Sequence, residues 1–340
     1  MTNSSVVRAK QHDELDEVSR RFAVAITPAM QDLIDPQNPA DPIALQFSPD
    51  IRELETHPDE LSDPIGDVPH SPVTGIVHRY PDRLLLTPVK VCPVYCRFCF
   101  RRETVGKQAH ALLTEAELDA AIRYISEHEE AWEVILSGGD PLILSPRRLK
   151  DIVRRLTAIE HVGVIRIHTR VPVVEPERIN PALLDALQSS KAVYVVLHSN
   201  HPRELTKAAK RACKSIIDTG IPMLSQTVLL KGINDDAQTL ATLLRQLVAN
   251  RIKPYYLHHA DKAAGTRRFR TSIAEGRALM DDLQGRISGL CQPTYVLDIP
   301  GGYGKVPLNE NRVVRDGAAE YRVRDYRGGQ HTYHDLDQTS

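Results

Sequence analysis

Short apolar segments recur along most of this 340-residue chain at intervals of about 30 residues. They are rich in Val, Ile and Leu, and amphipathic stretches such as 114–130 and 236–250 separate them. This rhythm is typical of repeated βα units around a parallel sheet. The chain is therefore predicted to be an α/β protein that forms a partial TIM-like (β/α)6 barrel. We expect strands in seven segments: 83–89, 132–140, 162–170, 192–200, 222–230, 254–259 and 293–300.

The two ends of the chain lie outside this rhythm. Residues 1–80 contain Pro- and Asp-rich stretches, so we expect a mostly helical and irregular N-terminal extension there. Residues 81–305 are predicted to form the barrel and to carry the functional site. Residues 306–340 are polar and rich in Arg and Asp, which predicts a short C-terminal surface tail.

Charge and hydropathy argue against several classes of partner. The formal net charge of −1 gives no reason to expect binding to nucleic acid or to an anionic membrane. No run of about 18 apolar residues occurs, and the N-terminus has no apolar secretory segment. The five cysteines are an odd number and mostly clustered, which does not indicate a disulfide framework. We therefore expect a cytoplasmic protein.

Polar residues follow nearly every predicted strand, and a barrel would collect them at one mouth. Active sites of such barrels form at the carboxyl ends of the strands. For any single residue, the alternative is that a polar side chain simply begins a loop. The residues concerned are Asp140, His168, Arg170, His198, Asn200, Gln226, His258, Asp261 and Asp298.

Three of the five cysteines, Cys92, Cys96 and Cys99, form a C-x3-C-x2-C motif after the first predicted barrel strand. Thiolates are soft ligands that favour zinc, copper(I) or iron–sulfur clusters. A structural zinc ion takes four ligands, which leaves His110 as a possible fourth, and an electron-transfer cluster usually takes four cysteines. Three thiolates on a four-iron cube instead leave one iron free to bind another molecule, and we favour this interpretation.

A second unusual stretch is LDIPGGYGKVP, residues 297–307, which places Lys305 after a glycine-rich run. A phosphate-binding P-loop would need Gly at position 299 and Ser or Thr at 306, but the chain has Ile299 and Val306. Two interpretations are left open by the residues alone. Lys305 is either an ordinary surface lysine or a lysine that forms a Schiff base with pyridoxal phosphate.

The cysteine motif has an aromatic residue, Phe98, just before its last cysteine, and this form resembles the motif of radical S-adenosylmethionine (radical SAM) enzymes. Over roughly residues 20–310 the chain resembles the lysine 2,3-aminomutase family. The segments that carry the resemblance occur in one order: HRYPDRLLL, CPVYCRFCFRR, LSGGDPL, HSNHP, LSQTVLLKGIND, PYYLHHAD and DIPGGYGKVP. It implies a radical SAM barrel with a 4Fe–4S cluster, S-adenosylmethionine and pyridoxal phosphate. The implied reaction moves the amino group of L-lysine from C2 to C3 and gives L-β-lysine.

The resemblance also implies a role for each matching residue. Arg83 would bind the phosphate of pyridoxal phosphate beside Tyr80, and Arg101 would pair with the substrate carboxylate. The cluster would be bound by Cys92, Cys96 and Cys99; S-adenosylmethionine by Gly138, Gly139, Asp140, His198 and Gln226; pyridoxal phosphate by Lys305; and the distal ammonium of lysine by Asp261 and Asp298.

Structural alternatives exist for several of these roles. Arg101 could offset the charge of the cluster, and His198 and Gln226 could be hydrogen-bonded core residues. Asp261 and Asp298 could be loop caps or could pair with nearby cations, because a buried carboxylate needs a cation or donors.

Two further functions are left open. Short relatives modify a lysine of elongation factor P, so a protein-linked lysine is the first alternative substrate. A non-catalytic iron–sulfur electron-transfer or metal-binding protein is the alternative of a different class. The family's longer members carry zinc-binding cysteines, one at the position of Asp236 and others beyond Cys291, where this chain has none. The expected partners are L-lysine, an electron donor such as flavodoxin or ferredoxin, and further copies in a homo-oligomer.

Overall fold

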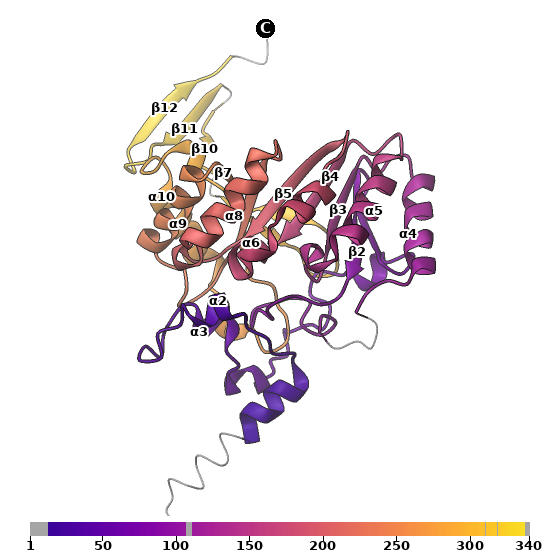
Figure 1. The fold of residues 1–340 in the computed structure, drawn as a ribbon. Coiled ribbons are helices and arrows are strands. Elements are labelled where there is room, and N and C mark those ends of the chain that lie inside the picture. Colours follow the sequence, from indigo (N-terminus) through magenta and orange to yellow (C-terminus); the bar gives the residue numbers. More distant parts are fainter. Residues whose placement is uncertain (1–12, 107–110, 310, 318, 337–340) are drawn as a thin grey trace, which may run out of the picture.

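A curled sheet of nine strands forms the centre of the computed structural model, which describes residues 13–106, 111–309, 311–317 and 319–336 (Figure 1). The strands follow one another around the sheet in chain order. Strands β2 to β8 are parallel, whereas β1 and β9 pair antiparallel at the two edges. The sheet consists of β1 (Ile76–Tyr80), β2 (Arg83–Val89), β3 (Glu133–Gly138), β4 (Val164–Thr169), β5 (Ala192–His198), β6 (Met223–Leu229), β7 (Ile252–His259), β8 (Thr294–Asp298) and β9 (Lys305–Pro307).

All seven predicted strands are present, and the α/β half-barrel is confirmed. Their central residues are almost completely excluded from water, as expected of parallel strands that are covered by helices. Fully buried examples come in alternating pairs on neighbouring strands: Leu84 and Leu86, Val134 and Leu136, Ile165 and Ile167, Val195 and Leu197.

The longer helices between the strands are amphipathic and begin at side-chain caps. Helix α4 buries Leu118, Ala121 and Ile125, which lie on one face at helical spacing, and starts with a capping box between Thr114 and Glu117. None of the helices in the described ranges has the length and apolar content that a membrane crossing requires. The helices of the barrel are α4 (Glu115–Glu127), α5 (Pro146–Thr157), α6 (Val171–Val174), α7 (Pro181–Ala186), α8 (Lys207–Asp218), α9 (Ala237–Ala249) and α10 (Ile273–Leu283).

Short 3-10 turns connect several of these elements. They are η3 (Pro141–Ile143), η4 (Pro176–Arg178), η5 (Pro202–Glu204), η6 (Arg267–Phe269) and η7 (Gly289–Cys291).

The N-terminal segment covers the mouth of the barrel with short helices and turns. Residues 13–21 are helical, followed by α2 (Pro28–Gln31), α3 (Ala44–Phe47), η1 (Ile51–Leu54) and η2 (Val68–His70). Gln46 of α3 is fully buried and contacts two residues beyond the strand ends, accepting a hydrogen bond from Arg170 at 2.6 Å and donating one to Glu204 at 3.1 Å. The segment is thereby fixed to the carboxyl ends of the strands.

The C-terminal residues form a separate antiparallel sheet of three strands, β10 (Val313–Arg315), β11 (Glu320–Arg324) and β12 (Gln330–His334). Figure 1 shows this sheet in yellow beside α10. An ion pair between Arg312 and Asp281 of α10 joins it to the barrel. We expected a polar surface extension here and did not anticipate these strands.

The two edges of the nine-stranded sheet meet. The main-chain N–H of Lys305, at the start of β9, donates to the hydroxyl oxygen of Tyr80, at the end of β1, over 2.8 Å. The curled sheet is therefore bridged at this point by a hydrogen bond between a side chain and a main-chain group.

Candidate active site

The three cysteines lie in the loop after β2, and a buried ion pair fixes this loop. Arg97, between Cys96 and Cys99, is 1% exposed, and its guanidinium donates to both carboxylate oxygens of Glu53 at 2.5–3.1 Å. The N–H of Cys99 donates to the carbonyl of Cys96 over 3.1 Å. The loop with Cys92, Cys96 and Cys99 is thus anchored to the N-terminal segment.

The spacing of the cysteine sulfur atoms does not suit a single metal ion. Within the described ranges, only one group of three His, Cys, Asp or Glu residues has ligand atoms that all lie within 4.8 Å of one another, and it does not include cysteine. Sulfurs bound to one zinc ion, each about 2.3 Å away, would lie at most about 4.6 Å apart. His110, the alternative zinc ligand, lies outside the described residues.

The surroundings of the cysteines disfavour the thiolate form unless a positive charge is added. Burial, together with the neighbouring Cys96, raises the pKa of Cys99 to about 11. Burial and the charge of Asp140 raise the pKa of Cys92. Burial also raises the pKa of Cys96, although Arg170 opposes this rise through a guanidinium nitrogen 2.9 Å from the sulfur. Metal coordination supplies the charge that such thiolates require.

The glycines at the end of β3 allow close contact with the cysteine loop. Gly138 has φ of +104°, and a Cβ on Gly139 would overlap the main chain of Val91. The N–H groups of Gly139 and Asp140 donate to the carbonyls of Val89 and Val91 over 2.7 and 3.0 Å. Only glycine permits this backbone approach, which places the end of β3 directly beside the cysteine loop.

The carboxylate of Asp140 is buried and already hydrogen-bonded within the chain. One oxygen accepts from the N–H of Leu142 at 3.1 Å and the hydroxyl of Thr169 at 2.7 Å. The other accepts from the N–H groups of Arg170 at 2.6 Å and Val171 at 3.2 Å. Burial raises the pKa of Asp140, and these donors lower it in part. The side chain of Asp140 therefore joins the ends of β3 and β4.

His198 and Gln226 lie on the same face of the sheet, because they are register partners on β5 and β6. The ring of His198 packs edge-on against Phe98 of the cysteine motif, with 5.8 Å between ring centroids. Its Nε2 lies 3.2 Å from Oδ1 of Asn200. Burial holds the pKa of His198 well below its usual value, so the ring is neutral at pH 7.

Lys305 lies beside a buried carboxylate. Its Nζ donates to Oδ1 of Asp298 over 2.8 Å, and Nδ1 of His258 lies 3.6 Å from the other carboxylate oxygen. Burial alone would raise the pKa of Asp298, but the hydrogen bond from His258 and the charge of Lys305 hold it well below its usual range. Asp298 is therefore ionised throughout the neutral range.

The glycine-rich run before Lys305 forms the turn between β8 and β9. Gly301, Gly302 and Gly304 have φ of +89°, +88° and +92°. A Cβ on Gly302 would also overlap the ring of His70. Backbone conformation and close packing thus account for these glycines, and the turn directs Lys305 toward Asp298.

Asp261 is the second carboxylate of the site. With Asp298 it lines a cavity of about 970 Å³. Burial, together with the negative charge of Asp298, raises the pKa of Asp261 to about 7, although Lys305 and Arg101 partly oppose the rise. In the part of the chain that the structure describes, Asp261 forms no ion pair. The site therefore contains one carboxylate whose charge is only partly compensated.

Arg101 is paired with a residue that the sequence did not indicate. Its Nε donates to Asp67 at 2.8 Å, and its Nη1 donates to the hydroxyl of Ser137 at 3.3 Å. The second oxygen of Asp67 accepts from Arg79 at 2.6 Å. Burial would lower the pKa of Arg101, but Asp67 raises it, so the guanidinium stays charged.

Arg83 and Tyr80 contact each other at the edge of the sheet. The guanidinium of Arg83 lies over the ring of Tyr80, 3.8 Å from its centroid, and also donates to Asp82 at 2.6 Å.

Another group beside Lys305 is His168, whose Nε2 is buried and has no hydrogen-bond partner in the described structure. Burial and the charge of Arg166 hold the pKa of His168 well below its usual value.

Comparison with known proteins identifies this arrangement. Residues 86–244 match the family model of the Radical SAM superfamily, and residues 280–340 match the model described as Lysine-2,3-aminomutase. The chain is 42% identical over 314 residues to an L-lysine 2,3-aminomutase of Acetoanaerobium sticklandii, covering 92% of this chain and 76% of that protein. The chain belongs to the lysine 2,3-aminomutase family.

Two more relatives show the range of the family. An L-lysine 2,3-aminomutase of Clostridium subterminale is 38% identical, with 95% of this chain and 78% of that protein covered. A glutamate 2,3-aminomutase of Clostridioides difficile is also 38% identical, with coverages of 94% and 75%. A solved radical SAM methyltransferase from Sphaerobacter thermophilus overlaps at a TM-score of 0.45 with 21% identity, covering 65% of this chain and 68% of that one, which adds nothing to the argument.

Membership of the lysine 2,3-aminomutase family makes this protein a radical SAM isomerase and implies a 4Fe–4S cluster and S-adenosylmethionine. The residues present fit the cluster, because Cys92, Cys96 and Cys99 lie in one loop and sit where a thiolate needs positive charge. The non-catalytic electron-transfer or metal-binding protein is therefore set aside.

The residues around Lys305 also fit pyridoxal phosphate. The main chain of Lys305, the ring of Tyr80 and the guanidinium of Arg83 contact one another in turn where the sheet edges join. The unpartnered Nε2 of His168 supplies a hydrogen-bonding atom for a polar ligand. A buried polar atom without a partner is costly, and a bound molecule that pairs with it would remove this cost.

The fold thus brings the predicted residues together in two groups. One group lies beside the cysteine loop, and the other lies around Lys305, Asp298 and Asp261. Sequence reasoning assigned no role to Asp67, although its carboxylate connects two arginines. It placed His258 at the mouth but did not detect its pairing with Asp298, because these partners lie on different strands.

Proposed function

We propose that this protein is a radical SAM, pyridoxal-phosphate-dependent 2,3-aminomutase that interconverts L-lysine and L-β-lysine. The observation that carries this proposal is the carboxylate pair Asp261 and Asp298 beside Lys305. The charge of Asp298 raises the cost of ionising Asp261, and the distal ammonium of lysine would relieve this repulsion. A cationic ligand would compensate the charge of Asp261, which forms no ion pair in the described part of the chain.

The two aspartates also argue against glutamate as the substrate. Its distal carboxylate would face Asp261 and Asp298 in a largely desolvated site. Like-charge juxtaposition in such a site costs several kcal/mol, and an unpaired partner of a desolvated charge pair costs about 2–5 kcal/mol. A chain of similar overall identity can act on glutamate only if the residues that face the distal group differ, so these two aspartates support lysine.

We assign Arg101 to the substrate carboxylate. Its guanidinium is a planar fork that suits a carboxylate, and Asp67 occupies it at 2.8 Å in this structure. The pairing with Asp67 shows that a carboxylate can approach this face of Arg101. Because Asp67 also pairs with Arg79, it keeps a cationic partner when the substrate takes its place on Arg101.

We assign Lys305 to pyridoxal phosphate, with Arg83 for the phosphate group and Tyr80 beside it. When bound, pyridoxal phosphate supplies a carbonyl carbon to which the migrating nitrogen attaches, and S-adenosylmethionine supplies the radical that removes hydrogen from C3. Within the chain, Asp298 holds the lysine amine in place, and the hydrogen bond from Lys305 to Tyr80 fixes the main chain beneath it.

We assign the main chain around Gly138 and Gly139, together with His198 and Gln226, to S-adenosylmethionine. The carboxylate of Asp140 is satisfied internally, so its proposed role is to hold the ends of β3 and β4 in position beside the cluster. The neutral ring of His198, packed on Phe98, would contact the cosubstrate without adding charge.

Three broader parts of the proposal concern partners and location. The cluster would receive its electron from a flavodoxin or ferredoxin, and the active form would be a homo-oligomer. A cytoplasmic location would keep the five cysteines, all unpaired in this structure, in the reduced state.

The lining of the cavity favours one second candidate, a lysine linked to elongation factor P. A bound polypeptide would need a wider and more basic entrance than free lysine does, and basic side chains outnumber acidic ones around this cavity. An acidic protein surface would suit such a rim. The basic residues are Arg52, Lys231, Lys262, Arg267, Arg268 and Arg270.

Anaerobic reconstitution tests the proposal. The full chain is loaded with iron, sulfide and pyridoxal phosphate, then incubated with S-adenosylmethionine, a reductant and free L-lysine, L-glutamate or elongation factor P. Formation of β-lysine from free lysine supports the proposal, and Asp261→Asn should lower that activity. Turnover only of the protein-linked lysine supports the second candidate. Conversion of glutamate alone, or of none of the three, would contradict both.

A further inference from the structure

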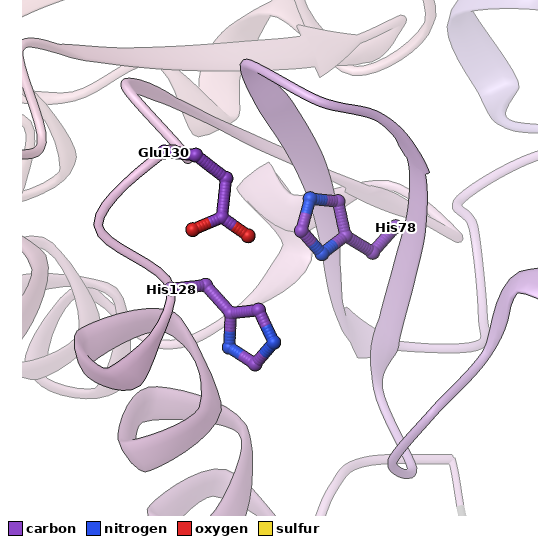
Figure 2. A group of neighbouring side chains, drawn as sticks. All are labelled: His78, His128 and Glu130. Atoms are coloured by element: carbon purple, nitrogen blue, oxygen red, sulfur yellow. The ribbon is translucent and has the colours of Figure 1, made fainter.

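Two histidines and a glutamate converge outside the site described above. His78 lies on β1, His128 caps the end of α4, and Glu130 lies in the connection from α4 to β3 (Figure 2). One ring nitrogen of each histidine and one carboxylate oxygen of Glu130 all lie within 4.8 Å of one another. No other set of three His, Cys, Asp or Glu side chains in the described ranges is arranged this closely.

Tyr124 of α4 orients both rings. Nδ1 of His128 lies 2.7 Å from the main-chain carbonyl oxygen of Tyr124, and a carbonyl oxygen can only accept. Nδ1 must therefore carry the proton, which leaves the lone pair of Nε2 free to bind a metal. The ring of Tyr124 stacks on His128 with 3.7 Å between centroids, and its hydroxyl lies 2.9 Å from Nδ1 of His78.

We propose that His78, His128 and Glu130 bind one divalent first-row transition-metal ion, with water completing its coordination. Two imidazoles and a carboxylate form a donor set that zinc and iron(II) accept in proteins. A histidine ligand whose second nitrogen donates to a backbone carbonyl is typical of metal sites, because that hydrogen bond fixes the tautomer and the ring orientation. His128 has this arrangement.

The position of the three residues suggests a structural role for the ion. His78 is half-buried and Glu130 is exposed, so an ion can enter from solvent without unfolding of the barrel. A bound ion would cross-link the edge strand β1 to the connection that leads into β3. Tyr80, whose hydroxyl bridges the two sheet edges, lies two residues after His78 on the same strand. The ion would therefore stabilise the strand that holds this edge in place.

The test uses the full chain in its cluster-loaded form, prepared without oxygen, so that Cys92, Cys96 and Cys99 are occupied. Equilibrium dialysis against Zn²⁺ followed by metal analysis should give one zinc ion per chain beyond the iron of the cluster. Removal of a residue that only supports a metal ligand weakens metal binding about 10–100-fold. His128→Ala and His78→Ala each remove a proposed ligand itself, so each should weaken zinc binding by at least about 100-fold. Glu130→Gln should weaken it by at least about 10-fold.

Matched controls separate this site from nonspecific binding. Glu129 is the exposed neighbour of Glu130. His161 is a half-buried histidine whose ring is hydrogen-bonded to the carbonyl of Ile125 in α4, the helix that His128 caps. Glu129→Gln and His161→Ala should bind zinc as the wild type does. Zinc should also raise the melting temperature of the wild type and of Glu129→Gln more than that of Glu130→Gln, an exposed isosteric change that should leave the fold intact.

Two results would overturn the proposal. One is the absence of zinc binding by the cluster-loaded wild type at micromolar metal. The other is equal zinc affinity in Glu130→Gln, Glu129→Gln and His128→Ala.

Discussion

Nζ of Lys305 lies 2.8 Å from Oδ1 of Asp298, its register partner in the antiparallel pair of β8 and β9. This contact joins the proposed cofactor lysine to one of the two proposed substrate carboxylates. If Lys305 becomes attached to pyridoxal phosphate, its amine is no longer available as a free ammonium to pair with Asp298. A substrate ammonium could then take the place of that charge, so cofactor binding would prepare the site for a cationic substrate.

The first prediction concerns Lys305 itself. Lys305→Ala should abolish the visible absorbance of pyridoxal phosphate bound to lysine, and aminomutase activity should fall to the level of protein prepared without this cofactor. Lys262→Ala, a change in the cavity that Asp261 and Asp298 line, should keep the absorbance. An absorbance spectrum of each purified variant decides the matter, and a retained band in Lys305→Ala would refute the assignment.

The second prediction is a pH dependence that arises from Asp261. Burial and Asp298 raise its pKa to about 7, so the carboxylate is protonated and uncharged below that pH. An uncharged group cannot pair with the substrate ammonium, so kcat/KM for lysine should fall about tenfold per pH unit below pH 7. In Asp261→Asn, kcat/KM should be low and should lack this limb. The same limb in both proteins would assign the titration to another group.

The third prediction concerns stability without cofactors or substrate. The folded state holds the proton of Asp261 more tightly than the unfolded chain does, because the pKa of this carboxyl group is 3.8 in the unfolded chain and about 7 in the folded state. The resulting contribution to stability is present below pH 4 and is lost as the pH rises through about 7. Asp261→Asn should therefore raise the free energy of unfolding by about 1–3 kcal/mol at pH 8 and by less at pH 5. Urea unfolding at both pH values measures this, and destabilisation at pH 8 would contradict it.

The fourth prediction tests the anchor of the cysteine loop. Glu53 is fully buried and accepts hydrogen bonds from Arg97 and Arg102. Glu53→Gln leaves buried guanidinium charge without its partner and should cost about 3–5 kcal/mol of unfolding free energy. The cluster should also be lost more quickly in the presence of a chelator. Asp151→Asn, which removes an exposed ion pair with Arg154, should change stability by less than about 1 kcal/mol.

The fifth prediction concerns the glycine pair after β3. A methyl group at position 139 would overlap the main chain of Val91, so Gly139→Ala should displace the cysteine loop from the end of β3. We expect reduced cluster content after reconstitution and weaker binding of S-adenosylmethionine, measured by iron analysis and by calorimetry. Gly289→Ala is the matched control, because a Cβ there meets no atom within 4 Å. Equal cluster content in both variants would contradict the role given to this contact.

The sequence predicted the parallel strands well because their signal is local. A strand buried on both faces needs consecutive Val, Ile and Leu, and this composition is visible without knowledge of its neighbours. Edge strands do not need it. Strand β1 reads IVHRY and β9 has three residues, so neither was anticipated. The strands β10 to β12 are mostly exposed, and polar residues in such strands resemble those of a surface tail.

The residues of the candidate site likewise fall into those that short sequence motifs reveal and those that only the fold brings together. The cysteines, the glycine pair and Lys305 belong to short motifs whose spacing is informative in itself. Asp67 could not be assigned, because its partner Arg101 lies 34 residues away and only the fold brings them together. His78 and His128 likewise come from a strand and a helix end that are separate in sequence, and no motif connects them.

The hydrogen bond between Lys305 and Tyr80 has a consequence for how this enzyme could be assembled. A fully closed barrel has a continuous wall, and its contents can enter only through an open end. Here the wall is interrupted where β1 and β9 face each other, and the amine proposed to carry vitamin B6 lies at that interruption. Separation of these two strands would open a lateral entrance to the amine.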